Sequence, residues 1–390
     1  MAGTGKHILF IGNLPTPYGG VATHCHNLVH HLAIANVNIY FLDSKPRPFK
    51  QIPKGISFFS ISKKIHVLAV AVILFLLKPS RWRWLFQIPL RDFIKLASIW
   101  YKGCQILKTY PCINIIHSQH ITAISLASTL LKEKFKTRHL ATVHGAEITD
   151  FKLFIKWKKC IDYVIQNVDT LISVSKYTAK HVENYYPHAK NKLNIIPNGV
   201  GPEFKLDLEA KRERKILFVG DFHPRKGVNI LLQAFHTLKD LGWSLHLVGT
   251  PGSALVEVQQ LISHLDLDQK VSISLNVSHE ALINIYNKAS IFVFPTQLET
   301  EGFGIVALEA MSSGCPVIAS NIAAIPEIVE HEKTGLLFPP GDIRALGKEI
   351  KRLIIDEVFR SQLVAHAQQS LIKYDWGNIA ARTKQLYESD

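Results

Sequence analysis

The chain has 390 residues, 47% of them hydrophobic, and a formal net charge of +14. This length and apolar content suffice for two domains with substantial cores. No apolar stretch reaches the roughly 18 residues of a spanning helix, and residues 1–7 lack the apolar region of a signal peptide. We therefore expect no transmembrane segment and a cytoplasmic protein.

Neither the cysteines nor the other ligand types form a metal or disulfide pattern. The five cysteines are scattered without a Cys-x-x-Cys pair, which suits a reducing compartment. His26 and His30 lie four apart in an expected helix but have no obvious further ligand. Asp266 and Asp268 form an Asp-x-Asp that falls in a polar link between a helix and a strand. We expect no metal site.

The positive charge is concentrated in the first half of the chain. Residues 1–200 contain 26 Lys and Arg against 8 Asp and Glu, whereas the remaining residues contain 19 against 23. Segment 44–111 alone has 13 basic residues and one acidic residue, Asp92. No familiar nucleic-acid-binding signature accompanies this charge, so a nucleic acid is not an expected partner.

An apolar run, residues 65–77, lies inside this basic segment and is followed by the alternating Arg and Trp residues of 81–86. As a helix the run would be about 20 Å long, too short for the ~30 Å hydrocarbon core of a bilayer. Apolar residues beside Trp and Arg are typical of an interfacial segment. We predict peripheral membrane association here; a buried core helix with solvated basic residues is the alternative.

Expected strands and helices alternate along the first half. A strand at 7–12 precedes a loop containing Gly19 and Gly20, and a helix follows at about 22–33. A strand, glycine turn and helix start together can cradle an anion, although the two glycines could also form a plain turn. Further strands are expected at residues 114–118, 138–145 and 169–175, and the string 193–200 is expected to close the first domain.

Polar residues at strand ends mark a candidate ligand site, because ligands of open α/β sheets collect at the carboxyl ends of the strands. His144 comes at the end of the expected strand 138–145 and is positioned to face a ligand. A structural role is the alternative for a lone histidine. In the second half, strands are expected at residues 215–220, 243–249, 271–275 and 289–295, with a helix at about 228–238.

The segment after the strand at 289–295 places two carboxylates eight residues apart around a Gly-Phe-Gly turn. Glu301 lies in the loop, and Glu309 lies within the helix expected at 305–312. The glycines allow a tight turn, and the helix start offers free N–H groups to an anion. If a ligand places an anionic group at the helix start, one carboxylate can contact the ligand near that group and the other can contact the far end of the ligand. A sugar nucleotide has this shape. An ordinary strand-loop-helix unit is the alternative.

These segments resemble the retaining GT-B glycosyltransferases of family 4, also called glycosyltransferase group 1. Glu301, Phe303, Gly304, Glu309 and Ala310 match the family's Glu-x7-Glu motif, and similar sequence continues through residues 313–319, 325–329 and 334–342. The resemblance implies an α/β protein with two doubly wound Rossmann-like domains facing a cleft. It implies an acceptor-side domain at 1–202, a nucleotide-sugar-binding domain at 203–372 and a final segment, 373–390, that crosses back to the first domain.

The resemblance also implies roles for individual residues. Glu301 and His144 would contact the transferred sugar, Glu309 the ribose, and Lys226 with Arg225 the diphosphate. The family has an arginine where this chain has Asp221. An acid there should weaken diphosphate binding unless it turns away or pairs with Arg225, and Asp221 is not assigned to the site. The remaining donor-binding positions are backbone and turn residues: Gly19, Gly20, Asn276, Val277, Gly302, Phe303, Gly304 and Ile305.

The implied reaction is metal-independent transfer of a hexose or N-acetylhexosamine from a nucleoside diphosphate sugar to an acceptor hydroxyl, with retention. No cofactor is implied besides this donor substrate. The basic, aromatic segment 44–111 matches the family weakly and favours a lipid-linked glycan or glycolipid precursor at the cytoplasmic membrane face. A sugar-nucleotide epimerase of similar fold and a non-catalytic sugar-nucleotide-binding or membrane-scaffold protein are the alternatives.

Overall fold

The computed structural model describes residues 5–14, 20–45, 55–61 and 88–389. The chain divides into two compact units: Met1–Asn198 with Trp376–Asp390, and Gly199–Asp375. Gly19 and the segments 65–77 and 81–86, on which three sequence predictions fall, lie outside the described residues.

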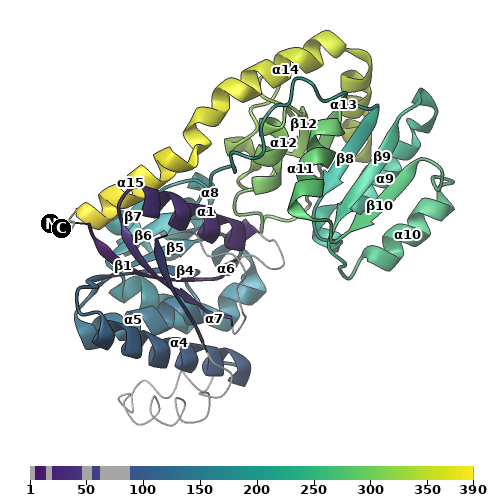
Figure 1. Ribbon diagram of the computed structural model, residues 1–390. Helices are drawn as coiled ribbons and strands as arrows, with labels where there is room; N and C mark the ends of the chain where they lie inside the picture. The colour runs from purple at the N-terminus through teal and green to yellow at the C-terminus, as the bar shows by residue number, and fades with distance from the viewer. Residues whose placement is uncertain (1–4, 15–19, 46–54, 62–87, 390) are drawn as a thin grey trace. The chain divides into compact units, whose positions relative to one another are not determined.

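The first unit contains a parallel sheet whose seven described strands have the order β3-β2-β1-β4-β5-β6-β7 (Figure 1). Short buried apolar runs form its centre, as is typical of parallel strands covered on both faces. The strands are β1 (His7–Gly12), β2 (Asn38–Asp43), β3 (Ile56–Ser60), β4 (Ile115–Gln119), β5 (Arg138–Val143), β6 (Thr170–Ser173) and β7 (Leu193–Ile195).

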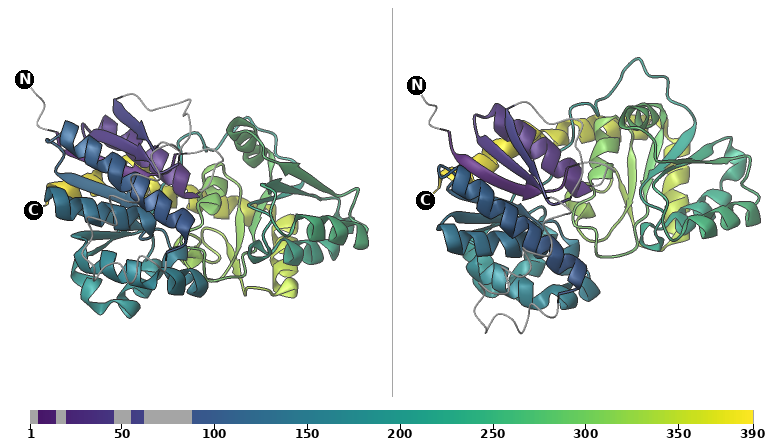
Figure 2. Two further views of the ribbon diagram at one scale, coloured as in Figure 1. Left: turned by 90° about the horizontal axis from the view of Figure 1, so that it is seen from below. Right: turned by 60° about the horizontal axis from the view of Figure 1, so that its bottom comes forward.

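Alternating side chains of β1 show how each face of this sheet is covered. Leu9 and Ile11 belong to a core beneath α4 (Leu90–Thr109), α5 (Ala123–Phe135) and α7 (Phe151–Asn167). Ile8 and Phe10 belong to a second core under other helices. Those are α1 (Gly20–Ile34) and α15 (Trp376–Glu388), so the end of the chain packs on its beginning. Figure 2 shows the dark blue α4 alongside α5.

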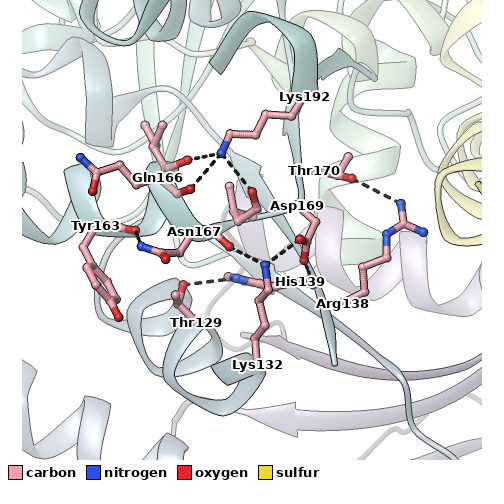
Figure 3. A network of polar contacts seen from close by, with 12 residues as sticks. Thr129, Lys132, Arg138, His139, Tyr163, Gln166, Asn167, Asp169, Thr170 and Lys192 are labelled. Atoms are coloured by element: carbon pink, nitrogen blue, oxygen red, sulfur yellow. Dashed lines mark hydrogen bonds and ion pairs between the residues drawn. The ribbon is translucent and has the colours of Figure 1, made fainter. Parts of the chain in front are cut away.

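Two lysines hold the carboxyl end of α7, whose last carbonyls have no partner within the helix. Lys192 donates to the carbonyl oxygens of Ile165 and Val168, the latter at 3.0 Å (Figure 3). Lys132 donates to Asn167 O and to Asp169 Oδ1, both at 2.6 Å. Cations at this helix end also complement the negative end of its dipole.

Between β5 and β7 the first unit has two more short helical elements and one longer helix. They are α6 (Ala146–Thr149), α8 (Lys176–Tyr185) and the 3-10 helix η2 (Pro187–Lys192). The Ser175 hydroxyl accepts from Thr178 N at 3.1 Å and caps α8.

The second unit contains a parallel sheet of six strands in the order β10-β9-β8-β11-β12-β13. Its strands are β8 (Lys215–Val219), β9 (Ser244–Gly249), β10 (Val271–Leu275), β11 (Ile291–Phe294), β12 (Val317–Ser320) and β13 (Leu336–Phe338). Its helices are α9 (Val228–His236), α10 (Leu255–His264), α11 (His279–Lys288), α12 (Ile305–Ser312), α13 (Ile343–Ile355) and α14 (Glu357–Ser370). Short 3-10 turns are η3 (Pro224–Lys226), η4 (Lys239–Leu241), η5 (Ile325–Glu327) and η6 (Leu371–Tyr374).

The predicted alternation of strands and helices is confirmed, and β1, β10 and α12 have the predicted bounds. Other ends differ by a few residues: β5 stops at Val143, because Gly145 turns the chain with φ +116. The sequence reasoning did not identify β2 or β3, which form the edge of the first sheet.

Gly249, at the end of β9, is required by the close approach of the neighbouring strand. A Cβ added there would lie 1.7 Å from the carbonyl oxygen of Gly220, a backbone atom that cannot swing away. Gly347 in α13 is a matched contrast, because an added Cβ would meet its nearest neighbour, Thr237 Oγ1, at 3.6 Å.

We expect Gly249→Ala to destabilise the second unit by about 1–3 kcal/mol, because β8 and β9 must separate to admit the methyl group. Gly347→Ala should instead stabilise it by about 0.5–1 kcal/mol, through a lower chain entropy in the unfolded state. Thermal unfolding followed by circular dichroism measures both. An unchanged melting temperature for Gly249→Ala would contradict the close packing.

Candidate active site

Lys226 is a buried cation in the loop between β8 and α9. Pro224 begins the 3-10 turn that carries it, and Gly227 ends the turn with φ +68. A Cβ on Gly227 would lie 1.9 Å from Pro295 O, so only glycine lets this loop pack against the one that follows β11. Gln297 N and Thr296 Oγ1 both donate to Arg225 O, at 2.8 and 3.1 Å, and join the two loops.

The structure brings Lys226 and Glu301, 75 residues apart in the sequence, into a direct ion pair. Lys226 Nζ lies 2.7 Å from Glu301 Oε2, and the two side chains are only 11% and 15% exposed. The Lys226 ammonium also lies 5.3 Å from the centre of the Phe294 ring, a cation–π distance. Removing one partner of such a pair leaves a poorly solvated charge and costs on the order of 3 kcal/mol.

Asp221 pairs with Arg225, which is one of the two arrangements expected to accommodate an acid at this position. Arg225 Nη2 lies 3.3 Å from Asp221 Oδ1, and Arg225 Nη1 lies 3.6 Å from Glu301 Oε2. Two cations and two carboxylates therefore alternate in space. Both Asp221 and Arg225 are about one-third exposed, so their pair is accessible to water.

The turn Gly302, Phe303, Gly304 leads into α12 at Ile305. Gly304 has φ +101 and precedes the first helical residue, a conformation that strongly favours glycine. Phe303 is buried, and its ring lies edge-on to Tyr374 at 6.0 Å between centroids. The first N–H groups of α12 thus start immediately after the loop that carries Glu301.

Glu309 lies within α12 and is buried, at the far end of this element from Glu301. Its Oε2 accepts from the Tyr286 hydroxyl at 3.0 Å. Nearby, His279 Nε2 and Glu203 Oε1 form a pair at 2.9 Å. Burial raises the pKa of Glu309 to about 7, although Tyr286 and His279 act in the opposite direction. The carboxyl group is therefore ready both to accept and to donate hydrogen bonds near neutral pH.

Asn276 and Val277 follow β10, at the same edge of the sheet as the loops after β8 and β11. Asn276 adopts φ +52, and its N–H donates to Gly249 O at 2.9 Å. Ser278 then caps α11 by accepting from Ala281 N at 3.2 Å. The second unit thus brings its predicted site residues to the carboxyl ends of its parallel strands.

His144 follows β5 in the first unit and is held on both its ring and its backbone. Its Nε2 lies 2.8 Å from Gln119 Oε1, and its backbone N–H donates to Glu147 Oε1 at 2.9 Å. Burial, with smaller effects of His120 and His24, lowers the pKa of His144 well below its usual value. The ring is neutral at physiological pH. Gly20, a predicted anion-binding residue, is the first residue of α1.

Several buried polar residues around His144 were missed from the sequence. His24 and His120 each place a ring centroid 5.0 Å from that of His144, and Glu147 Oε1 lies 3.4 Å from His120 Nδ1. Gln119 could have been found, because it ends β4 beside β5 and obeys the same strand-end rule as His144. His24 carried no signal, since it is one of several histidines in α1.

Among the residues that the structure describes there is no group of three or more His, Cys, Asp or Glu side chains that could hold a metal ion. None of the helices described is both long and apolar enough to cross a membrane.

The raised pKa of Glu309 predicts a pH-dependent stability. The folded state binds this proton more tightly than the unfolded state, whose carboxyl has a pKa near 4.5. The stabilisation by the proton is complete below pH 4.5 and is lost as the pH rises through about 7. In Glu309→Gln this loss should be absent, so the variant gains about 2.5 kcal/mol relative to the wild type between pH 5 and 8.

Urea unfolding of the ligand-free protein at pH 5, 6.5 and 8 measures this difference. Because the buried histidines are present in both proteins, their titration cancels. A difference that stays constant with pH would show that Glu309 titrates normally.

Known protein families match both units. Residues 203–370 match the model of glycosyl transferases group 1, and residues 18–204 match that of glycosyltransferase family 4. An uncharacterised glycosyltransferase of Methanocaldococcus jannaschii is 30% identical over 277 residues, which cover 71% of this chain and 75% of that protein.

Solved structures share the fold. Sucrose-phosphate synthase of Thermosynechococcus elongatus superimposes with a TM-score of 0.80 at 22% identity, covering 98% of both chains. The Anabaena protein HepE, solved with UDP and glucose, has a TM-score of 0.78 at 17% identity over 99% of this chain and 100% of its own. Both have the GT-B fold. The chain therefore belongs to the family 4, group 1 glycosyltransferases, has the GT-B fold and is a transferase.

Proposed function

We propose that this enzyme transfers a hexose or N-acetylhexosamine from a nucleoside diphosphate sugar to an acceptor hydroxyl, with retention and without a metal ion. The observation that carries the proposal is the ion pair of Lys226 with Glu301 in front of α12. A buried ammonium beside a helix start is suited to an anion, and the carboxylate that balances it is suited to sugar hydroxyls.

The donor diphosphate would replace Glu301 as the partner of the Lys226 ammonium. Its phosphates would neutralise Lys226, and the start of α12 would add about half a positive charge. Glu301 would then be free to accept hydrogen bonds from the sugar. Fixed positive groups of this kind stabilise the negative charge that grows on the departing nucleoside diphosphate.

The other end of the donor would be held by Glu309 and the β10 loop. Ribose hydroxyls suit a carboxyl group that is buried and already bonded to Tyr286. Asn276 and Val277 would support the base through backbone groups, which read its shape more than its identity. The UDP bound to HepE makes UDP-sugars the first donors to test.

We propose that His144, as well as Glu301, contacts the transferred sugar. The neutral imidazole can exchange hydrogen bonds with a sugar hydroxyl without adding charge. With retention, the diphosphate itself would receive the proton of the acceptor hydroxyl as the new glycosidic bond forms. Gly20, the first residue of α1, and Gly19, which precedes it in the sequence, would contribute backbone N–H groups to the diphosphate.

The acceptor we propose is a lipid-linked glycan or glycolipid precursor at the cytoplasmic face of a membrane. The support is the basic and aromatic sequence of residues 44–111. Helix α4 belongs to this segment, and its first residue, the apolar Leu90, is 72% exposed. Each cation near an anionic leaflet adds on the order of 1 kcal/mol of attraction. A water-soluble glycan is the alternative that an assay must separate.

A transfer assay tests the reaction and the acceptor together. Purified protein, radiolabelled UDP-, GDP- or ADP-sugar and host lipid extract are incubated, and label is counted in the organic and aqueous phases. We expect label in the organic phase from one donor. Glu301→Gln and Lys226→Met should each lower kcat/KM by about 100-fold or more. Glu330→Gln, which changes a 63%-exposed carboxylate, is the control and should not change it.

Transfer that survives both site substitutions would refute these assignments, provided circular dichroism shows all variants folded. Label that remains in water as a glycan would keep the transferase reaction but exclude the lipid acceptor.

Substitution of Asp221 should improve donor binding, in contrast to the substitutions of Glu301 and Lys226. In Asp221→Asn, Arg225 loses a competing carboxylate and becomes available to the diphosphate. An accessible ion pair is worth less than about 1 kcal/mol, so the donor KM should fall by about two- to fivefold. Glu213→Gln, which removes an exposed carboxylate paired with Lys215, controls for the change in net charge. A donor KM that rises in Asp221→Asn would mean that Asp221 itself supports the donor.

A further inference from the structure

A chain of buried polar groups connects the last helix of the protein to His144. The Tyr387 hydroxyl, on α15, lies 2.6 Å from His117 Nδ1. His117 Nε2 lies 2.8 Å from Thr142 Oγ1 and 3.3 Å from Gln119 Nε2. Gln119 Oε1 lies 2.8 Å from His144 Nε2. All of these atoms belong to the first unit.

The positions of the protons follow from what each atom can do. The Gln119 amide nitrogen only donates, so His117 Nε2 accepts from it and from the Thr142 hydroxyl, and the His117 ring proton sits on Nδ1, facing the Tyr387 oxygen. The Gln119 amide oxygen only accepts, so His144 must donate from Nε2. The remaining nitrogen of the His144 ring, Nδ1, then carries a lone pair.

We propose that Gln119, His117 and Tyr387 are positioning residues that fix the tautomer and ring orientation of His144. His144 is thereby held with Nε2 protonated and presents Nδ1 as an acceptor for a hydroxyl of the transferred sugar. This inference rests on the role of His144 in the proposed function, and it adds which nitrogen meets the sugar and what selects it.

Because His117 and His144 are neutral, each ring has one proton, and the tautomer says which nitrogen carries it. His117 and Gln119 are fully buried, and burial, with smaller effects of His24 and His139, lowers the pKa of His117 to about 3. Each of the two linked histidines therefore carries one ring proton at neutral pH. Turning the Gln119 amide over would reverse every hydrogen bond in the chain, so its members change together.

The backbone of His144 is held separately, which allows the ring effect to be isolated. Glu147 accepts the His144 N–H and lies beside His120. Burial raises the pKa of Glu147, but His120 and the His144 N–H outweigh it, so the net pKa is lowered and the carboxylate stays ionised. Changing Gln119 or Tyr387 leaves this backbone contact in place.

The test is nitrogen NMR of the full-length protein labelled with 15N-histidine, at pH 7, with His144 assigned by its loss in His144→Asn. The variants are Gln119→Met, which keeps the side-chain length without the amide, and Tyr387→Phe, which removes one hydroxyl. Thr383→Val is the matched control: it removes a buried hydroxyl from the same helix, where Thr383 Oγ1 donates only to Ile379 O at 2.9 Å.

We expect the wild type and Thr383→Val to show His144 protonated on Nε2 alone. Gln119→Met should move its two nitrogen shifts towards a mixture of tautomers, and Tyr387→Phe should move them part of the way. In the transfer assay, kcat should fall about tenfold in Gln119→Met and about threefold in Tyr387→Phe with little change in the donor KM, whereas Thr383→Val should match the wild type.

Unchanged His144 shifts in both Gln119→Met and Tyr387→Phe would overturn the inference. So would a wild-type His144 protonated on Nδ1. If His144→Asn retains full transfer, the role of His144 in the proposed function fails, even where the tautomer shifts are as expected. NMR therefore tests the tautomer inference, and the transfer assay separately tests the role of His144 in the proposed function.

Discussion

The buried ion pair between Lys226 and Glu301 is the interaction on which the second unit's site depends. It holds a full positive charge at the carboxyl ends of parallel strands, where α12 begins, at a position that water reaches poorly. Without Glu301 the ammonium would be costly to keep, and without Lys226 the site would be acidic. In the ligand-free protein the carboxylate balances the charge of the ammonium, and in the proposed function a diphosphate would replace the carboxylate as its partner.

His144, a candidate site residue of the first unit, is held by hydrogen bonds, whereas Lys226 is held by an ion pair. Burial is the main cause of the lowered pKa of His144, and the residue is held by hydrogen bonds to Gln119 and Glu147. Neutral groups that exchange directional hydrogen bonds can distinguish one sugar hydroxyl from another, whereas a full charge would attract any oxygen. In the proposed function, charge would serve the diphosphate and directional hydrogen bonds would serve the sugar.

The fold and family could be predicted because they follow from local patterns. Strands of buried apolar residues, glycine turns and the pair Glu301 and Glu309 are all readable within about ten residues of sequence. The Lys226 and Glu301 contact was not predicted, because it joins loops 75 residues apart. Gln119 follows the predicted strand 114–118 and was within reach of the strand-end rule, but its contact with His144 depends on β5 lying beside β4. The predicted site residue Gly19 and membrane segment 65–77 lie outside the described residues and stay predictions.

In the proposed function Lys226 binds the diphosphate and not the nucleoside. Calorimetric titration of UDP, GDP and ADP, each compared with its own nucleoside, into the wild type and Lys226→Met tests this role. We predict that one diphosphate binds the wild type at least about tenfold more tightly than its nucleoside, the equivalent of roughly 1.4 kcal/mol. Lys226→Met should lose that preference and keep the nucleoside affinity. Equal affinity of both proteins for the diphosphate would show that Lys226 does not bind it.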